Sequence, residues 1–143
     1  MSIEMSLAEN KTFQIFRTFM PRRKEILNYK NHDVFDLIIY PKGYFLKFNP
    51  TTNFKKHALA KVSNFNNTPE GMEQFTLTSG KYAEFTIKGH IPNPEIFNYI
   101  YSTWLPNSDF SLNDRPHFDI LSEKMQQKST DADQELWIPV PLK

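Results

Sequence analysis

Residues 81–88 have the sequence KYAEFTIK, in which the side chains alternate in character along the chain. Such alternation is typical of a β-strand, because successive side chains point to opposite faces of a sheet. One face of this strand carries Ala83, Phe85 and Ile87, and the other carries Tyr82, Glu84 and Thr86. The sequence therefore predicts a strand with one apolar face and one face that mixes aromatic and polar groups.

Other segments rich in β-forming residues lie before and after this strand, separated by Gly, Pro, Asn and Asp. They predict strands over residues 2–7, 34–40, 56–65, 73–77, 118–123 and 134–138. A Thr-Ser-Gly turn at residues 78–80 joins the strand predicted at 73–77 to that of 81–88. Residues 41–54 and 126–133 are expected to form irregular loops.

A first helix is predicted over residues 11–27, with Asn10 as its N-cap. Phe13, Phe16, Phe19 and Met20 recur at helical spacing and form one apolar stripe. Pro21 lies within this pattern and is expected to kink the helix or divide it in two.

A second helix is predicted over residues 94–105, because Asn93 is a good cap and Pro94 suits the first helical position. Pro106 is expected to end it. The residues on its apolar face are Phe97, Ile100, Tyr101 and Trp104.

The elements follow the order strand, helix, strand, strand twice over, with one additional strand between the two halves. This order predicts an α+β fold in which two helices pack on an antiparallel sheet. A length of 143 residues is typical of one domain, so residues 1–143 are expected to form a single unit.

The composition narrows the classes of function. The net charge of +1 produces no large positive field, so direct binding to nucleic acid is not expected. The chain has no cysteine, no apolar run long enough to cross a membrane and no signal peptide, which predicts a cytoplasmic protein without thiolate metal sites. Its four histidines lack the spacing of a metal site. The 13 Phe, 6 Tyr and 2 Trp suit a core or a pocket for flat ligands.

Four stretches in order resemble the GyrI-like, or effector-binding, family of small-molecule-binding domains. They are SGKYAEFTIKG at 79–89, YIYSTWLPNS at 99–108, RPHFD at 115–119 and ELWIPV at 135–140. The resemblance implies two β-α-β-β modules with approximate two-fold symmetry and a ligand groove where the modules meet. It also implies ligands that are hydrophobic and often cationic, bound by aromatic faces and buried acids.

Glu135 and Trp137 are the first candidate ligand-binding residues. They share one face of the last strand, while Leu136 and Ile138 share the other. A carboxylate beside an indole suits a lipophilic cation, since the ring adds a cation–π contact of roughly 0.5–2 kcal/mol. The alternative is that Glu135 faces solvent near the start of the strand.

Asp119 stands where the resembled family usually has Glu, and it shares a strand face with Leu121. The resemblance implies that this pair lines the pocket; the alternative is that the shorter acid caps a turn. Tyr82 is a further candidate, because it can stack on a ligand or hydrogen-bond an acid. Trp104 and Phe16 complete the set of candidates, although helical aromatic residues are more often part of a core.

Three hypotheses of function follow. The first is a stand-alone effector-binding protein for an aromatic, lipophilic or cationic molecule, with no cofactor. The second is a protein-interaction module that acts on DNA gyrase or on a transcription regulator. The third, which the family resemblance suggests, is a hydrolase of strained electrophilic rings, with Glu135 as general base and Tyr82 as hydrogen-bond donor.

Overall fold

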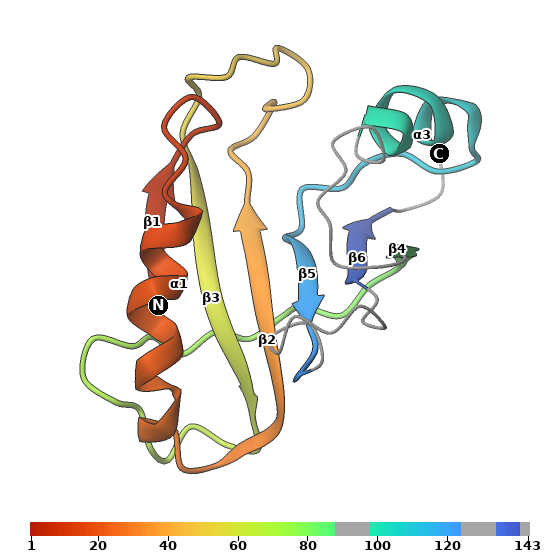
Figure 1. Cartoon of the computed structure of the whole chain (residues 1–143). Coiled ribbons are helices and arrows are strands. Elements are labelled where there is room, and N and C mark those ends of the chain that lie inside the picture. Colours follow the sequence, from red (N-terminus) through yellow and green to blue (C-terminus); the bar gives the residue numbers. More distant parts are fainter. Residues whose placement is uncertain (88–97, 124–133, 141–143) are drawn as a thin grey trace.

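The structure is a computed structural model that describes residues 1–87, 98–123 and 134–140. These residues form an α+β fold with a six-stranded antiparallel sheet (Figure 1). The strands are β1 (Ser2–Met5), β2 (Tyr29–Ile39), β3 (Phe54–Val62), β4 (Tyr82–Ile87), β5 (His117–Leu121) and β6 (Gln134–Pro139). The described helical elements are α1 (Thr12–Arg22), the single turn η1 (Arg23–Glu25), η2 (Ile100–Trp104) and α3 (Leu105–Asn107).

The strand order shows the predicted duplication. The sheet runs β1-β3-β2-β5-β6-β4. Exchanging β1 with β4, β2 with β5 and β3 with β6 gives the same order read from the opposite edge. One module contains β1, α1, β2 and β3, and the other contains β4, the helical segment 98–107, β5 and β6. The modules meet at the centre of the sheet, where β2 pairs with β5 from Val34 opposite Leu121 to Ile38 opposite His117.

The alternation of side chains gives the sheet two faces of different character. We call the face that packs against α1 and η2 the helix face. Under α1 it carries Val34 and Ala58, and under η2 and α3 it carries Leu136 and Ile138, all of them buried. We call the opposite face the crossover face, because the chain between β3 and β4 (residues 63–81) crosses it (Figure 1).

The first helix begins and ends close to the predicted residues. The N-cap residue is Lys11 rather than the predicted Asn10, although the Asn10 Oδ1 accepts a hydrogen bond from the backbone N–H of Thr12 at 2.9 Å. Pro21 lies inside α1, which ends one residue later and continues as the tighter turn η1. The predicted apolar stripe is wrong at Phe13, whose side chain is 78% exposed, because Ile15 and Phe19 form the buried face instead.

The prediction that Pro106 ends the second helix is wrong. The helix continues through Pro106 to Asn107, and residues 94–97 of the prediction lie outside the described part. The preceding turn η2 is a π-helix, in which the Leu105 N–H bonds to the Ile100 carbonyl. A wider turn at this point relieves the clash between the proline ring and the carbonyl of the previous turn, which explains how the helix accommodates Pro106.

The strand predicted at residues 73–77 is also wrong. This segment forms no β-ladder with any described strand. It crosses the sheet instead, where the ring of Phe75 lies 5.2 Å from that of His57 and the Ser2 hydroxyl donates a hydrogen bond to Glu73. The loop predicted at residues 126–133 lies outside the described part of the chain.

The described residues contain neither a membrane-spanning helix nor a cluster of metal ligands. No helix among them is both long enough and apolar enough to cross a membrane. No group of three or more His, Asp or Glu side chains within residues 1–87, 98–123 and 134–140 is arranged to hold a metal ion.

Phe19 and Phe13 provide a matched test of the way α1 packs. Phe19 is 1% exposed, and Phe19→Ala should lower the free energy of unfolding by about 3–5 kcal/mol through lost burial and a new cavity. Phe13→Ala should change it by no more than about 0.5 kcal/mol. Urea unfolding of both variants measures the difference. Equal effects would show that α1 presents another face to the sheet.

Candidate functional site

A cluster of aromatic rings lies on the helix face where the two modules meet. Phe45, from the loop at residues 41–51, is at its centre. Its ring stacks on Tyr101 with centroids 5.2 Å apart and an interplanar angle of 17°. It also stacks on His117, at 5.5 Å and 25°. Phe45 is therefore bound between a helix of the second module and the first residue of β5.

Two tyrosines complete the enclosure of the Phe45 ring. Tyr40, directly after β2, approaches it edge-on at 4.9 Å, and Tyr44 does so at 5.1 Å. We call the four surrounding rings of Tyr40, Tyr44, Tyr101 and His117 the aromatic box. Both edge-to-face and stacked contacts in this range are favourable, so the box provides defined contacts for one planar aromatic group.

The loop that carries Phe45 has a compact local structure. Gly43 adopts a φ of 79°, in the left-handed region that favours glycine. Around it, the Tyr44 N–H bonds to the Pro41 carbonyl at 3.1 Å, and the Leu46 N–H bonds to the Gly43 carbonyl at 3.0 Å. These turns bury Tyr44 and leave Phe45 38% exposed at the surface. The irregular loop predicted at residues 41–54 is confirmed, except that Phe54 begins β3.

Two carboxylates lie on the same face close to the box. Asp119 of β5 is directly opposite Asp36 of β2 in the central strand pair. Asp36 is paired with the buried Lys56 at 3.2 Å, and the Lys56 Nζ also donates a hydrogen bond to Thr12 at 2.9 Å. Burial raises the pKa of the Asp36 carboxyl, while the charge of Lys56 opposes the rise. The site thus combines two acids with one lysine.

The tyrosines of the box are influenced by Asp119. Burial raises the pKa of the Tyr101 hydroxyl, and the negative charge of Asp119 raises it further. The pKa of Tyr40 is raised well above its usual value, first by burial and then by neighbouring groups that include Asp119. Both tyrosines therefore remain neutral hydrogen-bonding groups under ordinary conditions, and Asp119 places negative potential across the box.

His117 contributes a neutral ring to the box. Its side chain is buried, and this burial lowers its pKa from 6.5 to about 4. The Nδ1 atom forms a hydrogen bond with the Tyr101 hydroxyl at 3.1 Å. Because His117 carries no charge near pH 7, it does not repel a cation, and the nearby acids and aromatic faces attract one. The arrangement is suited to a flat aromatic group that carries or adjoins a positive charge.

The structure divides the seven predicted site residues between the two faces of the sheet. Asp119 and Leu121 lie on the helix face, as their shared strand face predicts. Only Asp119 adjoins the box, because Leu121 packs in the cluster under α1, as does Phe16. Trp104 packs against Phe85 at 4.9 Å in the cluster under η2. Ligand contacts by Leu121, Phe16 and Trp104 stay predictions.

Glu135, Trp137 and Tyr82 lie on the crossover face. Trp137 stacks on Phe118 at 5.6 Å and 9°. Burial raises the pKa of Glu135, and a hydrogen bond with Glu84 raises it further. The predicted pairing of Glu135 with Trp137 on one face agrees with the register, but their role in binding stays a prediction. Since Asp119 faces the other way, Asp119 and Glu135 cannot line one cavity.

The geometry does not bring Glu135 and Tyr82 together as an acid–base pair. Glu135 is opposite Thr86, which is four residues along β4 from Tyr82 and hence roughly 13 Å away. The Tyr82 hydroxyl donates a hydrogen bond to the Pro116 carbonyl at 3.2 Å, and the Arg115 guanidinium lies 4.6 Å from the ring centre. The two side chains do not converge on one reacting atom.

Five ring-bearing residues of the site were not among the predicted ligand contacts: Tyr40, Tyr44, Phe45, Tyr101 and His117. Tyr101 was predicted to lie on the apolar face of its helix, and His117 adjoins Asp119 in the RPHFD motif. The alternation of side chains along β5 places His117 on the same face as Asp119, so the sequence pattern could have identified His117 as a site residue. Phe45 is in a loop, and no periodic pattern predicts where a loop residue packs.

Comparisons with known proteins agree with this architecture. A family model described as "Cass2: Integron-associated effector binding protein" matches residues 1–140. A solved structure, described as that of SAV2435 bound to tetraphenylphosphonium, superimposes with a TM-score of 0.62 at 16% sequence identity. The match covers 99% of this chain and 86% of that chain. No match was found among curated protein sequences.

The buried His117 should make stability depend on pH. Between pH 6.5 and about 4 the unfolded chain binds a proton at this residue that the folded chain does not. The free energy of unfolding should therefore fall as the pH is lowered through this window, by up to about 3 kcal/mol from His117 alone.

The contribution of His117 is isolated by comparing urea unfolding of wild type and His117→Asn from pH 7 to pH 4.5. The stability of the variant should depend less steeply on pH, whereas His32→Asn, at an exposed site, should give a curve parallel to wild type. Parallel curves for wild type and His117→Asn would show that His117 is accessible to protons in the folded state.

Proposed function

Because the chain belongs to the Cass2 family of integron-associated effector-binding proteins, a GyrI-like family, we propose that it binds a lipophilic aromatic cation in the aromatic box. The family description supports small-molecule binding as the general function. The neighbour SAV2435, bound to tetraphenylphosphonium, supports a ligand that is both aromatic and cationic. In this proposal the protein acts as an effector-binding, regulator-like module.

The observation that carries the proposal is the position of Phe45. Its ring is a flat aromatic group supplied by a surface loop, and it is stacked and enclosed by four other rings. The contacts that hold Phe45 are the same kind that hold an aromatic ligand. We infer that Phe45 stands in for a phenyl group of the ligand and leaves the box when the ligand enters.

The charges around the box favour a positive ligand over a neutral one. Asp36 and Asp119 provide two carboxylates, and Lys56 provides one cation that is ion-paired with Asp36. A cation in a partly buried site is strongly disfavoured unless charge or aromatic faces compensate it. Asp119 and the faces of Tyr40 and Tyr101 supply this compensation, since a cation over a ring gains roughly 0.5–2 kcal/mol.

The loop couples binding to a conformational change. A ligand that replaces Phe45 must overcome the contacts of this side chain, which lowers its apparent affinity. The same step moves residues 41–51, whose Leu46 and Phe48 are exposed. A ligand-dependent change in this surface is what a regulator-like protein needs in order to report that its effector is bound.

Titration calorimetry with tetraphenylphosphonium tests the charge requirement. The wild-type protein should bind this cation at least tenfold more tightly than neutral triphenylphosphine oxide. Asp119→Asn should lower the affinity for the cation by about tenfold, or 1.4 kcal/mol, and leave the affinity for the neutral compound almost unchanged. Glu135→Gln is the matched control on the crossover face and should retain wild-type affinity. Loss of cation binding in Glu135→Gln but not in Asp119→Asn would refute the assignment to the helix face.

The role of Phe45 gives a separate prediction. Phe45→Ala removes the ring that competes with the ligand, so tetraphenylphosphonium should bind roughly tenfold more tightly. Leu46→Ala, in the same loop at a side chain that is 89% exposed, should leave the affinity unchanged. The same calorimetric titration measures both variants. Weaker binding by Phe45→Ala would mean that this ring contacts the ligand rather than competing with it.

A further inference from the structure

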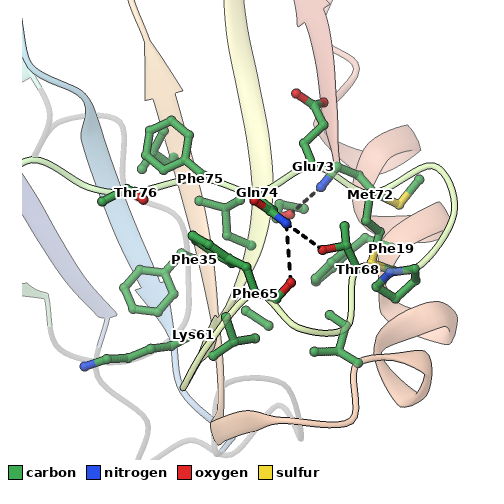
Figure 2. Close-up of a pocket in the computed structure, with 18 of the residues that line it drawn as sticks. Phe19, Phe35, Lys61, Phe65, Thr68, Met72, Glu73, Gln74, Phe75 and Thr76 are labelled. Atoms are coloured by element: carbon green, nitrogen blue, oxygen red, sulfur yellow. Dashed lines mark hydrogen bonds between the residues drawn. The ribbon is translucent and has the colours of Figure 1, made fainter.

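A cavity of about 400 Å³ lies between the crossover segment and strands β2 and β3 (Figure 2). It extends from the crossover face around the edge of β3, past Ser2 where β1 begins, to Phe19 and Ala60 on the helix face. The wall is mainly apolar, and its larger apolar side chains include Phe35, Leu37, Leu59, Phe65, Met72 and Phe75. This volume lies within the usual range for small-molecule pockets, roughly 300–1,000 Å³.

The cavity is separate from the aromatic box. Leu37 contributes to the cavity wall, and the next residue, Ile38, faces the opposite way and is paired in register with His117 of the box. The central strands of the sheet therefore lie between the box and the part of the cavity that is on the crossover face. A ligand in one site does not contact a ligand in the other.

The polar groups of the wall are bonded to the protein itself. The Gln74 side-chain amide donates hydrogen bonds to the Thr68 hydroxyl at 3.0 Å and to the Phe65 carbonyl at 3.4 Å. The N-terminal ammonium of Met1, which is also in the wall, donates a hydrogen bond to the Ala58 carbonyl at 2.9 Å. The charged side chains among the wall residues are those of Lys61 and Glu73, and both are exposed. Figure 2 shows their charged ends pointing away from the cavity. A charged group inside would consequently be buried without compensation.

His57 does not supply a charge either. It is buried beneath the ring of Phe75, and burial lowers its pKa, so the imidazole is neutral near pH 7. The buried side chains beside the cavity therefore carry no charge near pH 7, in contrast to the two carboxylates beside the box.

The crossover segment is attached in a way that suits a cover. It is held by separate contacts rather than by a β-ladder: the Asn67 side chain donates to the Glu25 carbonyl at 3.2 Å, Arg22 donates to the Glu70 carbonyl, and Ser2 donates to Glu73. Such a segment can adjust over a ligand without breaking the pairing of β2 with β3, because these three contacts are made by side chains and are not part of a β-ladder.

We propose that this cavity is a second ligand site, distinct from the aromatic box, and that it takes an uncharged, mainly apolar small molecule. The apolar wall, the internally bonded polar groups and the outward direction of Lys61 and Glu73 together define this class of ligand. Its position behind the central strands makes binding there independent of the charge on Asp119.

Methionine methyl NMR of the wild-type protein tests the proposal with a neutral probe, N-phenylnaphthylamine. Met72 lies in the cavity wall, whereas Met5 packs with Tyr44 next to the aromatic box. The probe should shift the Met72 methyl resonance and leave that of Met5 in place. Saturating tetraphenylphosphonium should neither reverse the Met72 shift nor weaken the probe.

Substitution provides a second, independent readout. Leu59→Trp fills the cavity and should lower the affinity for the fluorescent probe N-phenylnaphthylamine by at least tenfold. It should not alter the affinity for tetraphenylphosphonium. Leu27→Trp, at a leucine that is 78% exposed, is the matched control and should bind the probe like wild type. If Leu59→Trp does not fold, the Met72 and Met5 resonances of the wild-type protein still test whether the probe binds in the cavity.

Two results would overturn the proposal. One is displacement of the probe by tetraphenylphosphonium together with a shift at Met5, which would place both molecules in the box. The other is an unchanged Met72 resonance up to the solubility limit of the probe. Failure of tetraphenylphosphonium to bind at all would count against the aromatic box alone, because the probe titration does not depend on it.

Discussion

The antiparallel pairing of β2 with β5 is the constraint on which the rest of the structure depends. It is the seam between the two modules, and its register places Asp36 opposite Asp119 and Ile38 opposite His117. Because side chains alternate strictly along paired strands, this one register assigns every central residue to a face. Asp36, Asp119 and the rings of the aromatic box gather on the helix face, and most of the apolar cavity lies on the crossover face.

The aromatic box is formed by residues of both modules at the junction of β2 and β5. Tyr40 follows the end of β2, His117 begins β5, and Tyr101 comes from the helix of the second module, so neither module alone contains the box. Burial keeps the tyrosines and His117 uncharged, and the carboxylates beside them then dominate the local potential. Phe45 of the same chain stacks on Tyr101 and His117, so the position of its loop determines whether the box is occupied.

Much of the fold could be predicted from the sequence, because alternation and helical spacing are local properties. They identified the α+β class, the duplicated order and the faces of Glu135 and Asp119. They failed where the structure depends on distant contacts: residues 73–77 have strand-like composition but cross the sheet without pairing, and a π-turn accommodates Pro106. The same limit applies to the site. Local alternation cannot tell which face of one strand matches which face of another, so the sequence left open whether Asp119 and Glu135 share a cavity, and the register separates them. Phe45 enters the box through contacts far along the chain, which no periodic pattern encodes.

The most direct test of the central claim is a crystal structure of the protein with tetraphenylphosphonium. The account predicts a phenyl ring of the cation between Tyr101 and Tyr40, stacked near His117, with the phosphonium centre on the side of Asp119. It also predicts that Phe45 has left the box and that residues 41–51 have moved. A cation bound on the crossover face beside Trp137 and Glu135, with Phe45 still stacked on Tyr101, would contradict it.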